Sequence, residues 1–273
     1  MGTDGSNFGV GVGLSEYPGS AGSEIGPLLF ARYAFPPNEL GYCGPEAAAE
    51  KSLFASANAR PEEIRPLARQ FSAAWPYLEL IAEANELSDP LDQRVVSAYW
   101  VGNELLGRVT LEAFANSTIV RFEQRFGRSV EDLTFPLLHG ATLHHNFHVF
   151  AIYPWLGVLR NKHTEGPLQI LEQCRIRWGR VMSISSDAIM VASQFLVFDG
   201  WRLSLGEERI EKVHLPPGSI EGRLGPGDRI EVGDWVTLHW GWLCERLEND
   251  SLLGLQSTTS SIMSAVNFHP ERT

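Results

Sequence analysis

The spacing of apolar residues changes near residue 172, and this change restricts the folds that the chain can adopt. From about residue 27 to 165, apolar residues recur at steps of three and four, as in Leu67, Phe71 and Ala74, which is the period of an amphipathic helix. After residue 172, short apolar runs are separated by turn residues, a pattern typical of strands. The chain is therefore predicted to be α+β, with helices first and strands afterwards.

The helical part contains clear start signals. Pro61 precedes two glutamates, and proline and acidic residues both favour the first turn of a helix. Strong helix formers follow Pro45, and Asp92 introduces a long stretch that runs to Phe126. We expect a helical domain over residues 27–168. Residues 1–26, which are rich in Gly and Ser and lack an apolar period, are expected to form a flexible arm.

The C-terminal part predicts a small barrel. Residues 180–186 and 188–192 read as a hairpin with a Ser-Asp turn between them. Further short strands are expected at 195–198, 201–205, 209–215 and 235–244, a spacing that favours a small OB-like β-barrel. Residues 248–266 are expected to form a C-terminal helix that is capped by Asn249 or Asp250. Its packing residues are predicted to be Leu252, Leu255, Ile262 and Met263. The barrel domain, with this helix, is placed at residues 169–273.

Charge and cysteine usage limit the cellular setting. The formal net charge of −11 argues against nucleic acid or an anionic membrane as a partner, because both attract basic surfaces. Three widely spaced cysteines do not make a disulfide framework, and the start of the chain lacks an export signal. No apolar run approaches the roughly 18 residues needed to cross a bilayer. We expect a cytoplasmic protein with no membrane or nucleic-acid partner.

Two segments of the C-terminal part, residues 174–181 and 232–242, carry the most specific motif. Each offers one soft or borderline metal ligand, Cys174 in the first and His239 in the second. With these ligands, the chain from Cys174 to about Val266 resembles the HypC/HupF family of hydrogenase maturation chaperones. Residues at matching positions are Cys174, Gly179, Val181, Val232, Gly233, Asp234, Trp235, Val236, His239, Gly241 and Trp242.

The resemblance implies a function for this third of the chain. It implies an accessory protein of nickel-iron hydrogenase maturation, in which Cys174 and His239 bind or deliver an iron unit, Fe(CN)2CO. It also implies two partners, a HypD-like scaffold protein and the precursor of the hydrogenase large subunit. The ligand types suit the cargo, because cyanide and carbon monoxide make low-spin iron(II) a soft centre that a thiolate binds well.

Two departures from the family pattern leave an alternative open. Cys174 is internal, whereas the family cysteine follows the initiator methionine, and Trp178 stands where the family has proline. The alternative is a metal-free interaction module, in which the barrel is only a docking surface. On that interpretation His239 is a half-buried, hydrogen-bonded strand residue.

The helical part holds a second candidate metal site. His144 and His148 are four residues apart, so in a helix they would stand one above the other, with His145 pointing elsewhere. Such a pair can hold zinc, haem or non-haem iron. Its candidate completing ligands are His139, Glu104 and Glu112. The alternative is a helix face whose histidines bond to carboxylates or water.

Cys43 is a candidate nucleophile or second soft ligand. Its Tyr-Cys-Gly-Pro-Glu context is expected to end a loop and start a helix, whose positive end would lower the pKa of the thiol. Together with His144 and His148 it defines the alternative function, a metal- or thiol-dependent enzyme centred on the helical domain that supplies a ligand for the iron. A buried structural cysteine is the other interpretation.

Overall fold

The N-terminal part of the chain is helical, as predicted. The computed structural model describes residues 22–47, 50, 51, 53, 59–116, 130–162, 165–185, 188–216, 219, 223–225 and 228–268. The helices before the sheet are α1 (Gly22–Glu39), α3 (Pro61–Ala68), α4 (Trp75–Ala84), α5 (Gln93–Trp100), η1 (Glu104–Arg108), α6 (Leu111–Phe114), α8 (Val130–Leu138), α9 (His145–Phe147), η3 (His148–Ile152), α10 (Trp155–Lys162) and α11 (Glu165–Cys174).

A five-stranded antiparallel sheet follows, with the strand order β3-β2-β1-β6-β7. Its strands are β1 (Arg177–Ile184), β2 (Ile189–Phe198), β3 (Leu203–Val213), β6 (Trp235–His239) and β7 (Trp242–Leu247), and a separate pair is formed by β4 (Arg223–Gly225) and β5 (Asp228–Arg229). The predicted hairpin is confirmed as β1 and β2, and the α+β class is confirmed.

The sheet is barrel-like but not closed. Register shifts interrupt the β1–β2, β2–β3 and β6–β7 pairings, and such bulges bend and twist a sheet. The bending brings the end of β3 to the start of β7, where His214 and Trp242 form a single isolated bridge. A small apolar core that includes Val181, Val191 and Val236 fills the inside of this curl.

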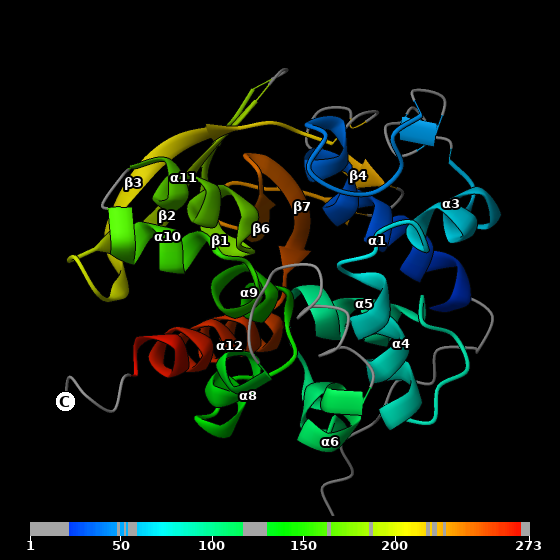
Figure 1. Ribbon diagram of the computed structural model, residues 1–273. Helices are drawn as coiled ribbons and strands as arrows, with labels where there is room; N and C mark the ends of the chain where they lie inside the picture. The colour runs from blue at the N-terminus through cyan, green and yellow to red at the C-terminus, as the bar shows by residue number, and fades with distance from the viewer. Residues whose placement is uncertain are drawn as a thin grey trace, which may run out of the picture.

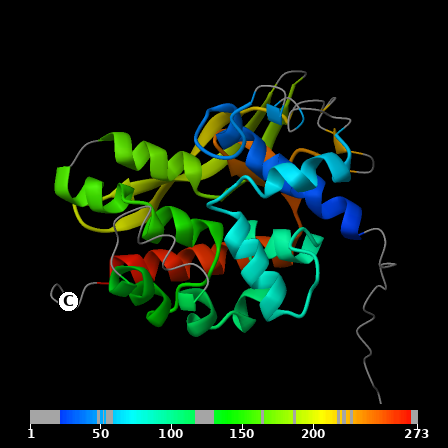
Figure 2. The ribbon, with the colours of Figure 1, turned by 45° about the vertical axis from the view of Figure 1, so that its right-hand side comes forward.

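The C-terminal helix α12 (Asn249–Asn267) lies between the sheet and α8 (Figures 1 and 2). This helix was predicted, and its four predicted packing residues are buried. The predicted cap is wrong, because the N-cap residue is Glu248, whose side chain accepts no capping bond. Asp250 lies in the first turn, where its charge can still interact favourably with the helix dipole.

The helical stretch after Asp92 is shorter than predicted. Asp92 does cap α5 by accepting a hydrogen bond from the backbone N–H of Arg94. The stretch is then divided, because the side chains of Asn103 and Thr110 cap two further short helices. Residues 117–129 lie outside the described part of the chain. Pro45 itself is not helical, but a helix follows it: residues 50, 51 and 53 are helical, and the N–H groups of Glu50 and Lys51 donate to the carbonyl of Ala47.

The helices and the sheet share one large apolar core. It joins Phe30 of α1, Trp100 of α5 and Phe147 of α9 to Cys244 of β7 and Leu255 of α12. The predicted boundary at residues 168 and 169 falls inside α11, and the division into two domains stays a prediction.

The predicted arm extends into described structure at its end. Helix α1 begins at Gly22, so the last residues of that arm are helical, while residues 1–21 lie outside the described part. Among the described helices, none combines the length and the apolar character that a membrane span requires.

Candidate metal centre

A cavity of about 300 Å³ lies where the helices meet the end of the sheet. Its walls come from α1 and the loop after it, from α5, from α9 and η3, from α11 and from the turn between β6 and β7. The volume far exceeds the about 10–15 Å³ that a cavity needs to hold one water molecule. The cavity therefore has room for a metal ion that carries several small ligands.

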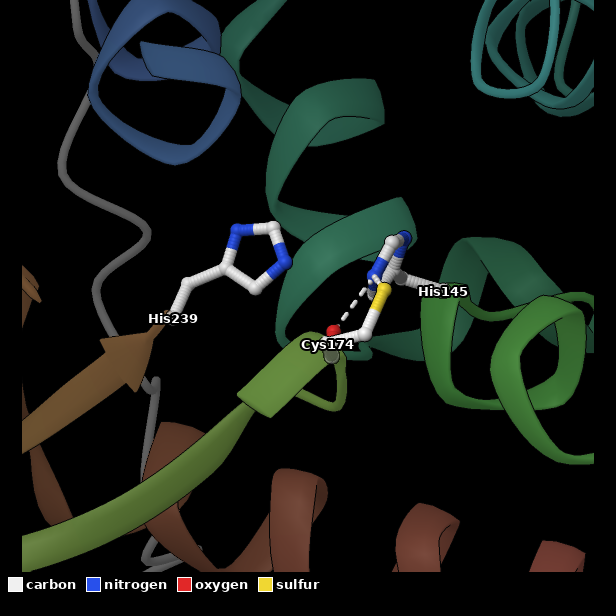
Figure 3. Close-up of side chains that lie close together, drawn as sticks. All are labelled: His145, Cys174 and His239. Atoms are coloured by element: carbon white, nitrogen blue, oxygen red, sulfur yellow. Dashed lines mark hydrogen bonds between the residues drawn. The ribbon is translucent and has the colours of Figure 1, made fainter. Parts of the chain in front are cut away.

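Three buried side chains on the cavity wall form a candidate metal centre. His145 is the first residue of α9, Cys174 is the last residue of α11, and His239 is the last residue of β6 (Figure 3). One donor atom from each lies within 4.8 Å of the other two, and the Cys174 Sγ is 4.0 Å from His145 Nε2. Ions bind such donors at about 2.0–2.3 Å, so a closure of about 1 Å would complete the site. This group can hold a metal ion.

Strand pairing brings Cys174 and His239 together. The antiparallel pairing of β1 with β6 places Arg177 opposite Leu238, so the residues before β1 lie beside the end of β6. The backbone N–H of Trp240 also donates to the carbonyl of Gln173 at 2.8 Å. The expected convergence of the thiol and the imidazole is therefore confirmed, whereas their binding of iron stays a prediction.

A buried network of charges fixes the chain around Cys174. The Arg175 guanidinium donates two hydrogen bonds to the carboxylate of Glu172, which also accepts one from the backbone N–H of Leu196. On the other side, Arg177 pairs with the carboxylate of Glu211. Both arginines are almost fully buried, and buried charges persist only when they are paired in this way. The residues on both sides of Cys174 are therefore held in place by these ion pairs.

Asn146 holds His145 against the same segment. Its side-chain carbonyl accepts from the backbone N–H of Ile176 at 2.6 Å, and its amide donates to the carbonyl of Ile176 at 2.9 Å. The same amide donates to the hydroxyl of Thr259 on α12 at 2.9 Å. Because His145 precedes Asn146, these bonds set the distance between the imidazole and Cys174.

His239 presents an available donor atom to the cavity. Its Nδ1 lies 2.7 Å from the carbonyl oxygen of Tyr33, which can only accept, so Nδ1 carries the proton. The Nε2 atom then has a lone pair, and it is buried without a hydrogen-bond partner. A histidine that donates through one nitrogen and offers the other is typical of metal ligands.

His145 needs a change of tautomer to bind an ion through Nε2. In the structure, Nε2 donates to the carbonyl of Cys174 at 2.9 Å, and Nδ1 lies 3.1 Å from the hydroxyl of Tyr99. The Tyr99 hydroxyl can donate or accept. It can therefore accept from Nδ1 once an ion takes the Nε2 lone pair.

The three donors are uncharged in the folded chain. Burial lowers the pKa of His239 to about 4 and that of His145 well below its ordinary value. Burial also raises the pKa of the Cys174 thiol, while the side chain of Trp240 acts in the opposite direction. An ion would supply the positive charge that favours the thiolate, so metal binding would release a proton.

The turn after His239 carries backbone strain beside the cavity. Trp240 and Gly241 form a two-residue hairpin with φ of 52° and 76°, and turns of this kind require positive φ at both positions. Glycine adopts such angles readily, but a bulky residue does so at a cost. The Trp240 ring stacks on Tyr42 at a centroid distance of 4.3 Å, which joins this turn to the loop after α1.

The predicted pairing of His144 with His148 is wrong. His144 is extended and caps α9, accepting a hydrogen bond from the N–H of Asn146, so the helix begins only at the next residue. After His148 the chain continues as a π-helical turn. His144 therefore does not line the cavity, whereas His148 does, with its Nδ1 3.1 Å from the hydroxyl of Tyr77. The proposed completing residues Glu104, Glu112 and His139 are exposed and lie elsewhere.

Cys43 lines the same cavity but in a different setting from the one predicted. It follows the C-terminal end of α1, and residues 45–47 are not helical, so no helix begins directly after Cys43. Cys244 is buried in β7 and does not line the cavity, as expected for a core residue.

His145 is the member of this three-residue group that the sequence did not reveal. The cluster of three histidines drew attention to this segment, but helical spacing favoured the wrong pair. The local cap at His144 and the buried Asn146 decide which ring faces Cys174, and the bond from Asn146 to Ile176 joins residues distant in sequence.

Comparison with known proteins gives a family but not a function. The chain belongs to a family of unknown function, DUF6390, whose family model matches residues 22–273. Neither the curated proteins nor the solved structures gave a match.

Proposed function

We propose that the chain is an accessory protein of nickel-iron hydrogenase maturation that binds an Fe(CN)2CO unit through His145, Cys174 and His239. The observation that carries the proposal is the convergence of three donors at one cavity, two of them at the positions of the HypC/HupF motif. The motif alone supplies only two ligands. The helical part supplies the third.

The number of donors suits this cargo. Three protein ligands on one side of an iron(II) ion leave three positions open in an octahedral complex. Two cyanides and one carbon monoxide would fill these positions. The remaining space of the cavity is largely walled by apolar and aromatic side chains, including Ala34, Phe71 and Trp100, which suits small ligands with little hydrogen-bonding capacity.

The partners of the proposal follow from the resemblance. A HypD-like scaffold protein would supply the iron unit, and the hydrogenase large-subunit precursor would receive it. Transfer requires that the buried ligands become accessible, because His145, Cys174 and His239 are each less than one tenth exposed.

Anaerobic purification from cells that express the maturation proteins tests the proposal. Metal analysis should find iron, and infrared spectra should contain cyanide and carbonyl stretches. Both signals should be lost in Cys174→Ala and His239→Gln. Cys244→Ala is the matched control, because it removes a buried thiol outside the cavity and should keep the signals. Stretches that persist in Cys174→Ala, or a wild-type chain without them, would refute the proposal.

A second function is favoured by the placement of Cys43 and His148 on the wall of the same cavity. These residues fit a metal- or thiol-dependent enzyme in which a small substrate lies between the thiol and the metal centre. Metal that is lost on His148→Ala but kept in Cys174→Ala would favour this enzyme. A metal-free chain that still captures the hydrogenase precursor would favour the interaction module instead.

A further inference from the structure

The cavity has a buried floor and a partly exposed mouth. His145, Cys174 and His239 form part of the floor and are buried. The mouth is lined by partly exposed residues such as Tyr42, Cys43 and Trp240. An ion that reaches the floor from solvent therefore passes the side chains at the mouth first.

Cys43 places a thiol at this mouth. Among the described lining residues that are partly exposed, the others are aromatic or apolar, and none offers a thiol, an imidazole or a carboxylate. A thiolate is the ligand that soft and borderline transition metals prefer. Cys43 also lies outside the group whose donor atoms are all within 4.8 Å of one another, so it is not part of the assembled centre.

The loop that carries Cys43 is held over the mouth. The side-chain amide of Asn38 donates to the carbonyls of Cys43 and Pro45, at 2.7 and 2.8 Å. The ring of Tyr42 stacks on Trp240, the residue that follows His239. These contacts keep the thiol beside the route to the floor.

A second observation points to a ligand in this cavity. The Nε2 atom of His239 is buried without a hydrogen-bond partner, and His239 lines the cavity. A donor atom left open in this way favours an ion at the floor.

We propose that Cys43 is a relay thiol, which binds a transition-metal ion at the mouth and passes it to Cys174, His145 and His239 on the floor. This inference rests on the metal-binding role proposed for the floor residues. On arrival, Cys43 loses its proton to water and forms a metal–sulfur bond. In the transfer that bond breaks, a bond from the metal to the Cys174 sulfur forms, and the Cys174 proton passes to Cys43. Removal of the ion follows the reverse steps.

Loading of the full chain with Co(II) alone tests this role. Stopped-flow absorbance would follow the thiolate-to-cobalt charge-transfer band under anaerobic conditions, and a chelator would then remove the ion. In Cys43→Ser we expect both rates to fall about tenfold, equivalent to about 1.4 kcal/mol at the barrier. The dissociation constant and the final band intensity should stay unchanged, because Cys43 is not a ligand in the final site.

Two variants keep the test decisive. Cys244→Ser removes a buried thiol outside the cavity and should load at the wild-type rate, and Cys43→Ala should repeat the slow loading without a hydroxyl. Wild-type rates in both Cys43 variants would overturn the relay. A weaker dissociation constant with a smaller band would overturn it as well, since Cys43 would then be a resident ligand.

The outcomes separate the two proposals. A wild-type chain that binds no Co(II) contradicts both. Slow loading in Cys43→Ser together with infrared spectra that lack cyanide and carbonyl stretches supports the relay and contradicts the iron unit.

Discussion

Replacement of Asn146 by alanine should destabilise the fold and loosen the metal centre together. The change leaves the N–H and the carbonyl of Ile176 and the hydroxyl of Thr259 without their partner. Each buried polar group left unsatisfied costs about 1–3 kcal/mol. With three groups affected, we expect the free energy of unfolding to fall by at least about 3 kcal/mol, measured by urea denaturation. Because His145 is no longer tied to the segment after Cys174, Co(II) binding should weaken at least about tenfold.

Asn85→Ala is the control for this prediction. Asn85 is also a buried asparagine, and its amide donates to the carbonyls of Ile81 and Leu105, away from the cavity. This variant should lose stability without losing Co(II) affinity. The reasoning is refuted if Asn146→Ala loses less than about 1 kcal/mol, or if both variants bind Co(II) equally well.

Three further predictions concern the surroundings of the centre. Tyr99→Phe removes the hydroxyl beside His145 Nδ1 and should weaken Co(II) binding about 10–100-fold, as measured by isothermal titration calorimetry. Tyr77→Phe, which removes the hydroxyl beside His148 Nδ1, should leave Co(II) affinity unchanged. An equal loss of affinity in both variants would exclude a role for Tyr99 in the tautomer of His145. Burial lowers the pKa of His144 to about 3 and that of His239 to about 4, below the unfolded value of about 6.5. The unfolded chain therefore takes up more protons than the folded chain below about pH 6.5, so the free energy of unfolding is highest above that pH. As the pH falls towards 4, each of these histidines lowers the free energy of unfolding by about 1.4 kcal/mol per pH unit. His144→Gln should reduce the slope of unfolding free energy against pH by that amount, and an unchanged slope would show that the ring is not held neutral. Arg175→Met removes both hydrogen bonds from Arg175 to the buried Glu172 carboxylate and leaves only Arg177 Nε, 3.5 Å away, as its cation. This change should cost about 3 kcal/mol in urea denaturation. A loss below about 1 kcal/mol would show that the network does not anchor the Cys174 segment.

The class of the fold was predictable because it depends on local periodicity. The steps of three and four before residue 172 reflect helices with one buried face, and the short apolar runs after it reflect strands. The convergence of Cys174 and His239 was also predictable, because a thiol before β1 and an imidazole at the end of β6 meet when these strands pair.

The third residue of the candidate centre, His145, was not predictable from spacing. Whether His145 or its neighbours face the cavity depends on where α9 begins, and that point is set by the cap at His144 and by Asn146. The place of Cys43 was likewise hidden, since it depends on Asn38 and on the stacking of Tyr42. These contacts join residues distant in sequence or depend on loop geometry, which periodicity does not describe.

Metal binding by two adjacent histidine variants tests the central claim most directly. His144 and His145 are both buried, but only His145 belongs to the centre. In anaerobic Co(II) titrations, the wild type and His144→Asn, whose side-chain oxygen can keep the cap on α9, should bind one ion per chain with similar affinity. His145→Gln should bind more than about 100-fold more weakly. Equal affinity in His145→Gln and the wild type would contradict a metal centre built on His145, Cys174 and His239.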